Sequence, residues 1–110
     1  MAPTQLEIKV RALQRLVKEE QFYQQELKDQ TEHVEKLKKE KDVDPYDLKK
    51  QVEVLEDTQR LLPTIYKKIE EFKEDLQDYM EGYDGSESLD TAREAIRSAE
   101  ELLASVKGKQ

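Results

Sequence analysis

The chain has no cysteine and no tryptophan, and only three prolines and three glycines in 110 residues. Without cysteine there is neither a disulfide framework nor thiolate chemistry, which is compatible with a reducing compartment. No stretch approaches the roughly 20 apolar residues of a membrane-spanning helix, and the first residues, Met-Ala-Pro-Thr, lack the apolar region of a signal peptide. We therefore expect a cytoplasmic protein with no membrane contact.

Sequence patterns of catalysis are also missing. His33 is the only histidine, and the chain has no HExxH pattern, no nucleophile with a nearby base and no glycine-rich phosphate loop. Carboxylates are abundant, but the Glu-x-x-His pairs of a two-metal carboxylate site do not occur. The sequence predicts that the protein is not an enzyme and uses no metal or other cofactor.

Positive charge is in deficit, since 26 acidic residues face 19 lysines and arginines for a net charge of −7. This balance argues against nucleic acid as the main partner. The acid excess is concentrated in residues 42–85, which carry thirteen acidic and six basic side chains. This acidic run is either a solvated face or the charge partner of basic residues on a neighbouring helix.

What the chain does have is strong apolar periodicity, which favours one helical domain despite a charged fraction of 41%. The sequence predicts a helix over about residues 4–40, which starts at the capping-box form Thr4-Gln5-Leu6-Glu7. A second helix is predicted over about 45–81, and a third over about 87–107. Apolar or small residues of the second helix alternate steps of four and three, typical of a coiled-coil seam: Leu48, Val52, Leu55, Thr58, Leu62, Ile65, Ile69, Phe72, Leu76 and Tyr79.

Pro63 lies inside the second predicted helix. Proline removes one backbone hydrogen bond and crowds the preceding turn, at about 3 kcal/mol in a regular helix. Because the periodicity keeps its phase on both sides, we expect one helix kinked at Pro63 rather than two helices.

The turns that join the predicted helices are short, so neighbouring helices must be antiparallel. The fold class predicted is all-α: an antiparallel up-down-up three-helix bundle with left-handed coiled-coil packing, two long helices and a shorter third. The third helix can cover only the half of the hairpin near Tyr79. This arrangement would bring Lys9, Arg11 and Arg15, and Arg93 and Arg97 from the third helix, toward the acidic run. The uncovered half would be either a closed coiled-coil tip or an exposed docking surface.

Ile8 and Phe22 lie on a strip away from the apolar seam of the first helix, with Arg15 between them. An exposed aromatic side chain beside an arginine is a plausible partner contact. The alternative, equally compatible with the sequence, is that Phe22 packs at the edge of the seam against the third helix.

Several stretches together resemble the tubulin-specific chaperone A family, also called tubulin-binding cofactor A, and the budding-yeast form in particular. The resemblance covers most of residues 5–107 and is least distinctive after Tyr83. The Tyr-Asp-Leu-Lys-Lys sequence after the first turn and the Leu-Pro pair inside the second helix are specific in combination. The matching stretches are Arg15-Leu-Val-Lys-Glu-Glu20, Tyr23-Gln-Gln-Glu-Leu27, Val43-Asp-Pro-Tyr-Asp-Leu-Lys-Lys50, Arg60-Leu-Leu-Pro-Thr64 and Phe72-Lys-Glu-Asp-Leu76.

The resemblance implies a cofactor that binds quasi-native β-tubulin after its release from the cytosolic chaperonin, before the α/β-tubulin heterodimer is assembled. It also implies a cytoplasmic location with a link to the microtubule cytoskeleton, and it leaves monomer and homodimer open. The competing interpretation is a structural coiled-coil subunit or scaffold of a larger helical complex.

The resemblance supplies no short binding motif, so candidate contact residues are chosen from surface chemistry. Tubulin is itself acidic, so basic patches would have to supply local charge complementarity. The candidates are Arg15, Lys18, Phe22, Lys49, Lys50 and Arg60.

Overall fold

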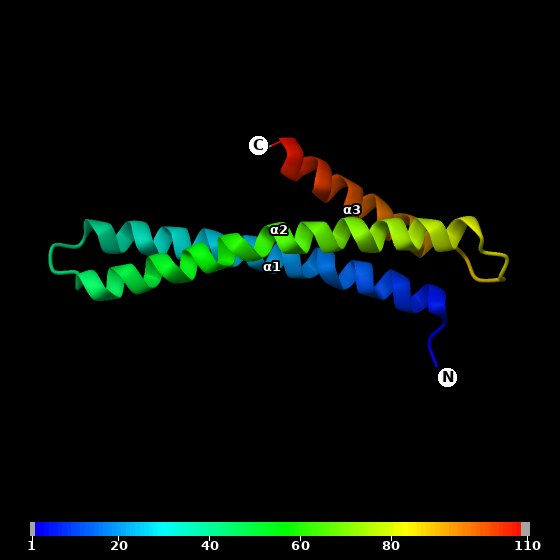
Figure 1. Cartoon of the computed structure of the whole chain (residues 1–110), viewed down its shortest axis with the longest axis horizontal. Coiled ribbons are helices and arrows are strands. Elements are labelled where there is room, and N and C mark those ends of the chain that lie inside the picture. Colours follow the sequence, from blue (N-terminus) through cyan, green and yellow to red (C-terminus); the bar gives the residue numbers. More distant parts are fainter. Residues whose placement is uncertain (1, 109–110) are drawn as a thin grey trace.

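The computed structural model describes residues 2–108, which form three α-helices and no strand. Helix α1 spans Gln5–Lys39, α2 spans Pro45–Glu81 and α3 spans Asp90–Gly108. Figure 1 shows α1 and α2 as a long antiparallel hairpin, with α3 running back along one half of it. The molecule measures 65 × 34 × 17 Å along its principal axes. The predicted all-α bundle of two long helices and a shorter third is confirmed.

Side-chain caps fix the starts of the two long helices. The Thr4 hydroxyl accepts a hydrogen bond from the backbone N–H of Glu7, and the Asp44 carboxylate accepts one from the N–H of Tyr46. Pro45 follows Asp44 at the first helical position, where an N–H would have no partner within the helix. Local chemistry therefore explains both starts.

Pro63 does not interrupt α2, which continues as one helix from Pro45 to Glu81. The prediction of a single helix through the proline is correct. The kink at Pro63 is not confirmed.

Helix α3 begins at Asp90, three residues later than the predicted start at 87. The Tyr83 hydroxyl accepts a hydrogen bond from the N–H of Glu87 at 3.0 Å, so this N–H is satisfied outside a helix. The Ser88 hydroxyl accepts a hydrogen bond from the N–H of Asp90 at 3.2 Å. With the N–H of Glu87 bound to Tyr83, the helix starts at Asp90, later than capping patterns indicate.

The main core lies where all three helices meet. Leu13, Ile69, Leu76 and Ala99 are each 0% exposed. The α3 contribution is rich in alanine, which lets that helix lie close to the hairpin. The buried cluster consists of Leu6, Val10, Leu13, Leu16, Ile65, Ile69, Leu76, Ala92, Ala95, Ile96, Ala99 and Leu103.

Beyond the end of α3 the hairpin continues as a two-helix arm, formed by the end of α1 and the start of α2 (Figure 1). Val34 and Thr58 are its buried side chains, while Leu27, Leu37, Leu48, Val52 and Leu55 are only half-buried. The Oε1 atom of Gln30 is buried without a hydrogen-bond partner. Because an amide oxygen is unsatisfied and few apolar side chains are fully buried, we expect the arm to unfold locally at a lower free energy than the three-helix half.

Ion pairs follow the predicted helix register only in part. Lys9 of α1 reaches Asp75 of α2 at 2.6 Å, as the antiparallel pairing predicts. Three of the four arginines expected at the acidic run pair instead within their own helices: Arg11 with Glu7, Arg15 with Glu19, and Arg93 with Asp90. Those partners lie one helical turn away, so pairing requires no reach across the bundle. The fourth arginine, Arg97, has no ion pair among the described residues.

The two glycines of the second turn should respond differently to alanine. A Cβ atom at Gly85 would lie about 2.5 Å from the Tyr83 hydroxyl oxygen, whereas one at Gly82 would meet no atom within 4 Å. Gly85→Ala should displace the tyrosine and break its hydrogen bond to Glu87, at a cost of about 1 kcal/mol. Gly82 has an ordinary φ of −95°, so Gly82→Ala should be neutral or stabilising by about 0.4–1 kcal/mol.

Urea unfolding followed by circular dichroism measures both glycine variants. A Gly85→Ala variant as stable as the parent would contradict the proposed role of Tyr83. Greater destabilisation by Gly82→Ala would contradict it as well.

Candidate partner-binding surface

Three of the six predicted contact residues gather on one surface of α1. Arg15, Lys18 and Phe22 line a shallow hollow together with Arg11, Gln14, Glu19 and Tyr23, and all seven belong to α1. Their spacing of three and four residues places them on neighbouring turns. We call Arg11, Arg15, Lys18 and Phe22 the α1 outer face.

Phe22 is exposed over 60% of its surface. Its ring makes an edge-on contact with Tyr23 of the same helix, with the centroids 5.7 Å apart. The alternative that Phe22 packs against the third helix is therefore wrong. Lys18 and Arg11 of the α1 outer face also line hollows that α1 shares with α3, whereas no α3 residue lines the hollow around Phe22.

The charges of the α1 outer face remain available to a partner. Arg11 and Arg15 pair with acids one turn away at 3.5 and 3.4 Å, and their side chains are 69% and 82% exposed. Exposed pairs of this kind contribute little, about 0–1 kcal/mol, because water screens them. A partner carboxylate could therefore compete for either guanidinium group.

Lys49 and Lys50 lie in the second turn of α2, next to the turn that joins the long helices. The ammonium group of Lys50 lies 5.3 Å from the centroid of the Tyr46 ring, within the range of a cation–π contact. These lysines lie far from the α1 outer face: Lys49 precedes Tyr66, the neighbour of Glu20, by 17 residues, or roughly 25 Å of helix.

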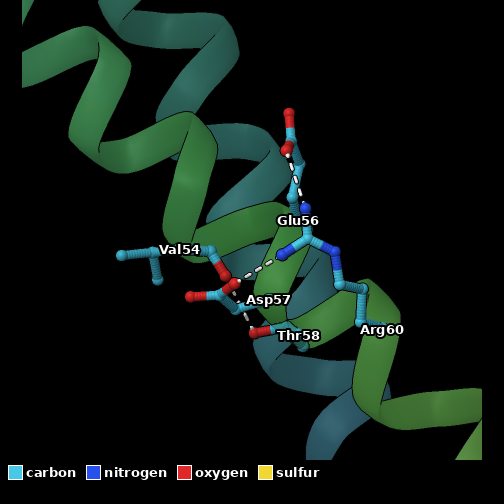
Figure 2. Close-up of polar contacts among 5 residues, drawn as sticks. All are labelled: Val54, Glu56, Asp57, Thr58 and Arg60. Atoms are coloured by element: carbon cyan, nitrogen blue, oxygen red, sulfur yellow. Dashed lines mark hydrogen bonds and ion pairs between the residues drawn. The ribbon is translucent and has the colours of Figure 1, made fainter.

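Arg60 lies between two acids of its own helix (Figure 2). Its guanidinium donates to Asp57 at 2.9 Å and to Glu56 at 3.4 Å, while the Thr58 hydroxyl donates to the carbonyl of Val54. Because its guanidinium group already binds two carboxylates, Arg60 offers a partner less uncompensated charge than Lys49 or Lys50 does. The six predicted residues thus fall into separate regions of the rod rather than one patch.

A buried polar cluster at the middle of the rod was not predicted. Glu20 is only 2% exposed. The Tyr66 hydroxyl donates to its carboxylate at 2.6 Å, and the Gln24 amide donates to both groups, at 3.2 Å to Glu20 and 2.8 Å to Tyr66. Burial, followed by donation to Glu20, raises the pKa of Tyr66 to about 12. The signal available in the sequence was a glutamate at a seam position opposite a tyrosine.

The structure also corrects the assignment of Phe72 to the apolar seam. Its side chain is 38% exposed, whereas its seam neighbours Ile69 and Leu76 are fully buried. Phe72 lies at the edge of the α1–α2 contact, beside Ile8 and Ala12.

Over the described residues, 2–108, no helix is long and apolar enough to cross a membrane. The same part of the chain holds no cluster of three or more His, Cys, Asp or Glu side chains that could bind a metal ion.

Comparison with known proteins gives consistent matches over almost the whole chain. A family model described as "Tubulin binding cofactor A" matches residues 1–103. The chain is 68% identical to tubulin-specific chaperone A of Saccharomyces cerevisiae over 105 residues, which covers 96% of this chain and 99% of the yeast protein. It is 36% identical to the protein of the same name in Homo sapiens over 91 residues, 83% of each chain.

A solved structure has the same fold. The protein named "RBL2P, beta-tubulin binding post-chaperonin cofactor" superposes with a TM-score of 0.85 at 66% sequence identity. The match covers 92% of this chain and 99% of the solved chain. At this identity the two chains share most of their aligned residues as well as the helical architecture.

Proposed function

This chain belongs to the tubulin binding cofactor A family, and from that premise we propose that it binds β-tubulin as a post-chaperonin folding cofactor. It would hold quasi-native β-tubulin before the α/β-tubulin heterodimer is assembled. The rod measures only 17 Å along its shortest axis, which is too thin to enclose an unfolded chain. Helical faces of this kind suit a folded or nearly folded partner that lies along them.

The single observation that supports a contact site is the exposure of Phe22 on the α1 outer face. Large aromatic and arginine side chains dominate the binding energy of many protein interfaces. Here a 60%-exposed phenylalanine lies beside two arginines and a lysine, and α1 alone forms the hollow around it. We place the main β-tubulin contact there, with Lys49 and Lys50 as a second basic region and Arg60 as the weakest of the six candidates.

The protein acts by binding alone in this proposal, without catalysis or a cofactor. It works in the cytoplasm, where tubulin assembles, and associates with the microtubule cytoskeleton through its partner. The family name describes a chaperone cofactor rather than an enzyme. The free protein is either a monomer or a homodimer, and sedimentation velocity distinguishes the two.

Capture of tubulin on the immobilised chain tests the proposal. The parent chain should retain β-tubulin without α-tubulin, and Phe22→Ala should weaken retention roughly tenfold or more. Reversal of charge in Arg15→Glu/Lys18→Glu should weaken binding and reduce its dependence on salt. Lys49→Glu/Lys50→Glu makes the same change in net charge in the second basic region, and it should weaken binding less than Arg15→Glu/Lys18→Glu does.

Two results would count against these proposals. If the parent chain retains neither α-tubulin nor β-tubulin, the proposed function is refuted. If Phe22→Ala and Arg15→Glu/Lys18→Glu keep their helicity and capture β-tubulin as well as the parent chain does, the α1 outer face is not the binding site.

A further inference from the structure

A second hollow lies between α1 and α2, and the proposed contact of Phe22 does not use it. It has a volume of about 300 Å³ and is lined by Ile8, Lys9 and Ala12 of α1 and by Glu71, Phe72 and Asp75 of α2. Ile8 and Phe72 are 46% and 38% exposed. No α3 residue lines it, so it opens on a side of the hairpin that α3 leaves uncovered. We call it the Ile8–Phe72 groove.

The Ile8–Phe72 groove is continuous with the α1 outer face. Ile8, Arg15 and Phe22 are spaced by seven residues, which is close to two full helical turns. The three side chains therefore form one strip along α1, with the groove at one end and Phe22 at the other. A partner that contacts Phe22 and continues along the rod would reach the groove.

Charge differs between the two edges of the groove. On the α2 edge, Glu71 is exposed and has no ion pair among the described residues. Asp75 is paired with Lys9 at 2.6 Å but keeps 61% of its side chain exposed. Lys9 itself is turned toward the helix pair, with its ammonium group 5.5 Å from the centroid of the Tyr79 ring. The α2 edge is thus acidic, whereas Ile8 and Ala12 on the α1 edge carry no charge and Lys9 is already paired.

We propose that the Ile8–Phe72 groove binds an apolar side chain of β-tubulin that is flanked by a lysine or arginine. The apolar side chain would cover Ile8, Ala12 and Phe72, and the flanking cation would face Glu71 and Asp75. The acidic side chains of the groove lie on the α2 edge alone, so they fix the orientation of the bound segment: its basic side must face α2. This inference depends on the proposed function and extends it to a second contact on the same partner.

Matched substitutions separate the groove from the rest of the rod. Ile8→Gln should weaken β-tubulin capture about tenfold or more. Val54→Gln is the control: it removes a similar β-branched side chain, 44% exposed, from the two-helix arm, and it should change capture less than about twofold. Circular dichroism should show the same helicity for both variants and the parent chain.

The acidic edge has its own matched pair. Glu71→Lys should weaken capture about fivefold or more, by repelling the flanking cation. Glu53→Lys is the control, because it makes the same change in charge 18 residues earlier on α2, and 18 residues are five full turns, which give the same angular position. Equal effects of the two lysine variants would overturn the proposed orientation.

The absence of native cysteine allows a direct footprint of the groove. A single cysteine introduced by Ala12→Cys should react with iodoacetamide in the free protein and be protected when β-tubulin is bound. Ala104→Cys, at an exposed position of α3, should react equally in both states. Equal reactivity of Ala12→Cys in both states would overturn the proposal.

These outcomes distinguish the two levels of inference. If the parent chain captures β-tubulin and Ile8→Gln captures it equally well, the groove proposal fails and the proposed function stands. If the parent chain captures none, the proposed function fails. If Ile8→Gln leaves capture unchanged but abolishes self-association in sedimentation velocity, the occupant is a second copy of the chain and the proposal is overturned.

Discussion

Ile69→Ala is expected to lower the free energy of unfolding by about 2–5 kcal/mol. Ile69 is fully buried at the centre of the three-helix core, so alanine removes several methyl and methylene groups and leaves a cavity. A loss of this size corresponds to a fall in Tm of roughly 10–25 °C for a domain of this length. Thermal unfolding followed by circular dichroism at 222 nm measures it.

Leu61→Ala is the matched control on the same helix. Leu61 is 45% exposed, so its truncation removes less buried surface and leaves no cavity, and should cost under about 1 kcal/mol. Similar losses for the two variants would mean that the three-helix core does not determine the stability of the chain.

Tyr66→Phe is expected to destabilise the fold by about 1.5–3 kcal/mol, although it removes a single oxygen atom. The lost hydroxyl is the close donor to the Glu20 carboxylate, at 2.6 Å, and that carboxylate is almost fully buried. In the variant, Glu20 keeps only the longer bond from Gln24, at 3.2 Å. Tyr46→Phe, at a position 63% exposed, should change stability by less than about 0.5 kcal/mol.

Coupling between the two residues provides a stricter test. Replacing both partners by apolar groups of similar shape can be nearly neutral, because no buried polar group is then left unpaired. The double variant Glu20→Leu/Tyr66→Phe should therefore be more stable than Tyr66→Phe alone. Additive losses in the double variant would contradict a coupled pair.

The same cluster predicts a dependence on alkaline pH. Burial, and then donation to Glu20, raises the pKa of Tyr66 from its ordinary value of 10.0 to about 12 in the folded chain. The unfolded phenol loses its proton first, so the stabilisation is complete below pH 10 and is lost as the pH rises toward 12. Tyr66→Phe should lose less stability than the parent chain over this window in urea unfolding.

Local sequence chemistry was enough to predict the helices themselves. Thr4, Asp44 and Pro45 mark the starts of α1 and α2, and the observed caps use those residues. The start of α3 was predicted too early because it depends on a contact between Tyr83 and Glu87 that no capping pattern describes. Pro63 illustrates the opposite case, since a strong local breaker lies inside a helix that continues across it.

Surface sites were harder to predict than helices. Phe22 was identified from its position off the seam, and the structure exposes it as required for a contact. Lys49, Lys50 and Arg60 were grouped with it by charge alone, and the rod separates them from it. Phe72 was assigned to the core because its spacing fits the seam, yet it forms one wall of the Ile8–Phe72 groove.

The sequence by itself determined the helical class, the antiparallel order and the family, because helix periodicity, short turns and family motifs are properties of neighbouring residues. Only the tertiary structure decided which seam positions are covered. Helix α3 lies along one half and one side of the hairpin (Figure 1), so seam positions of α2 differ in burial: Ile69 is fully buried, Leu55 is half-buried and Phe72 stays exposed. Burial depends on how many helices surround a position, and periodicity along one chain does not specify that number.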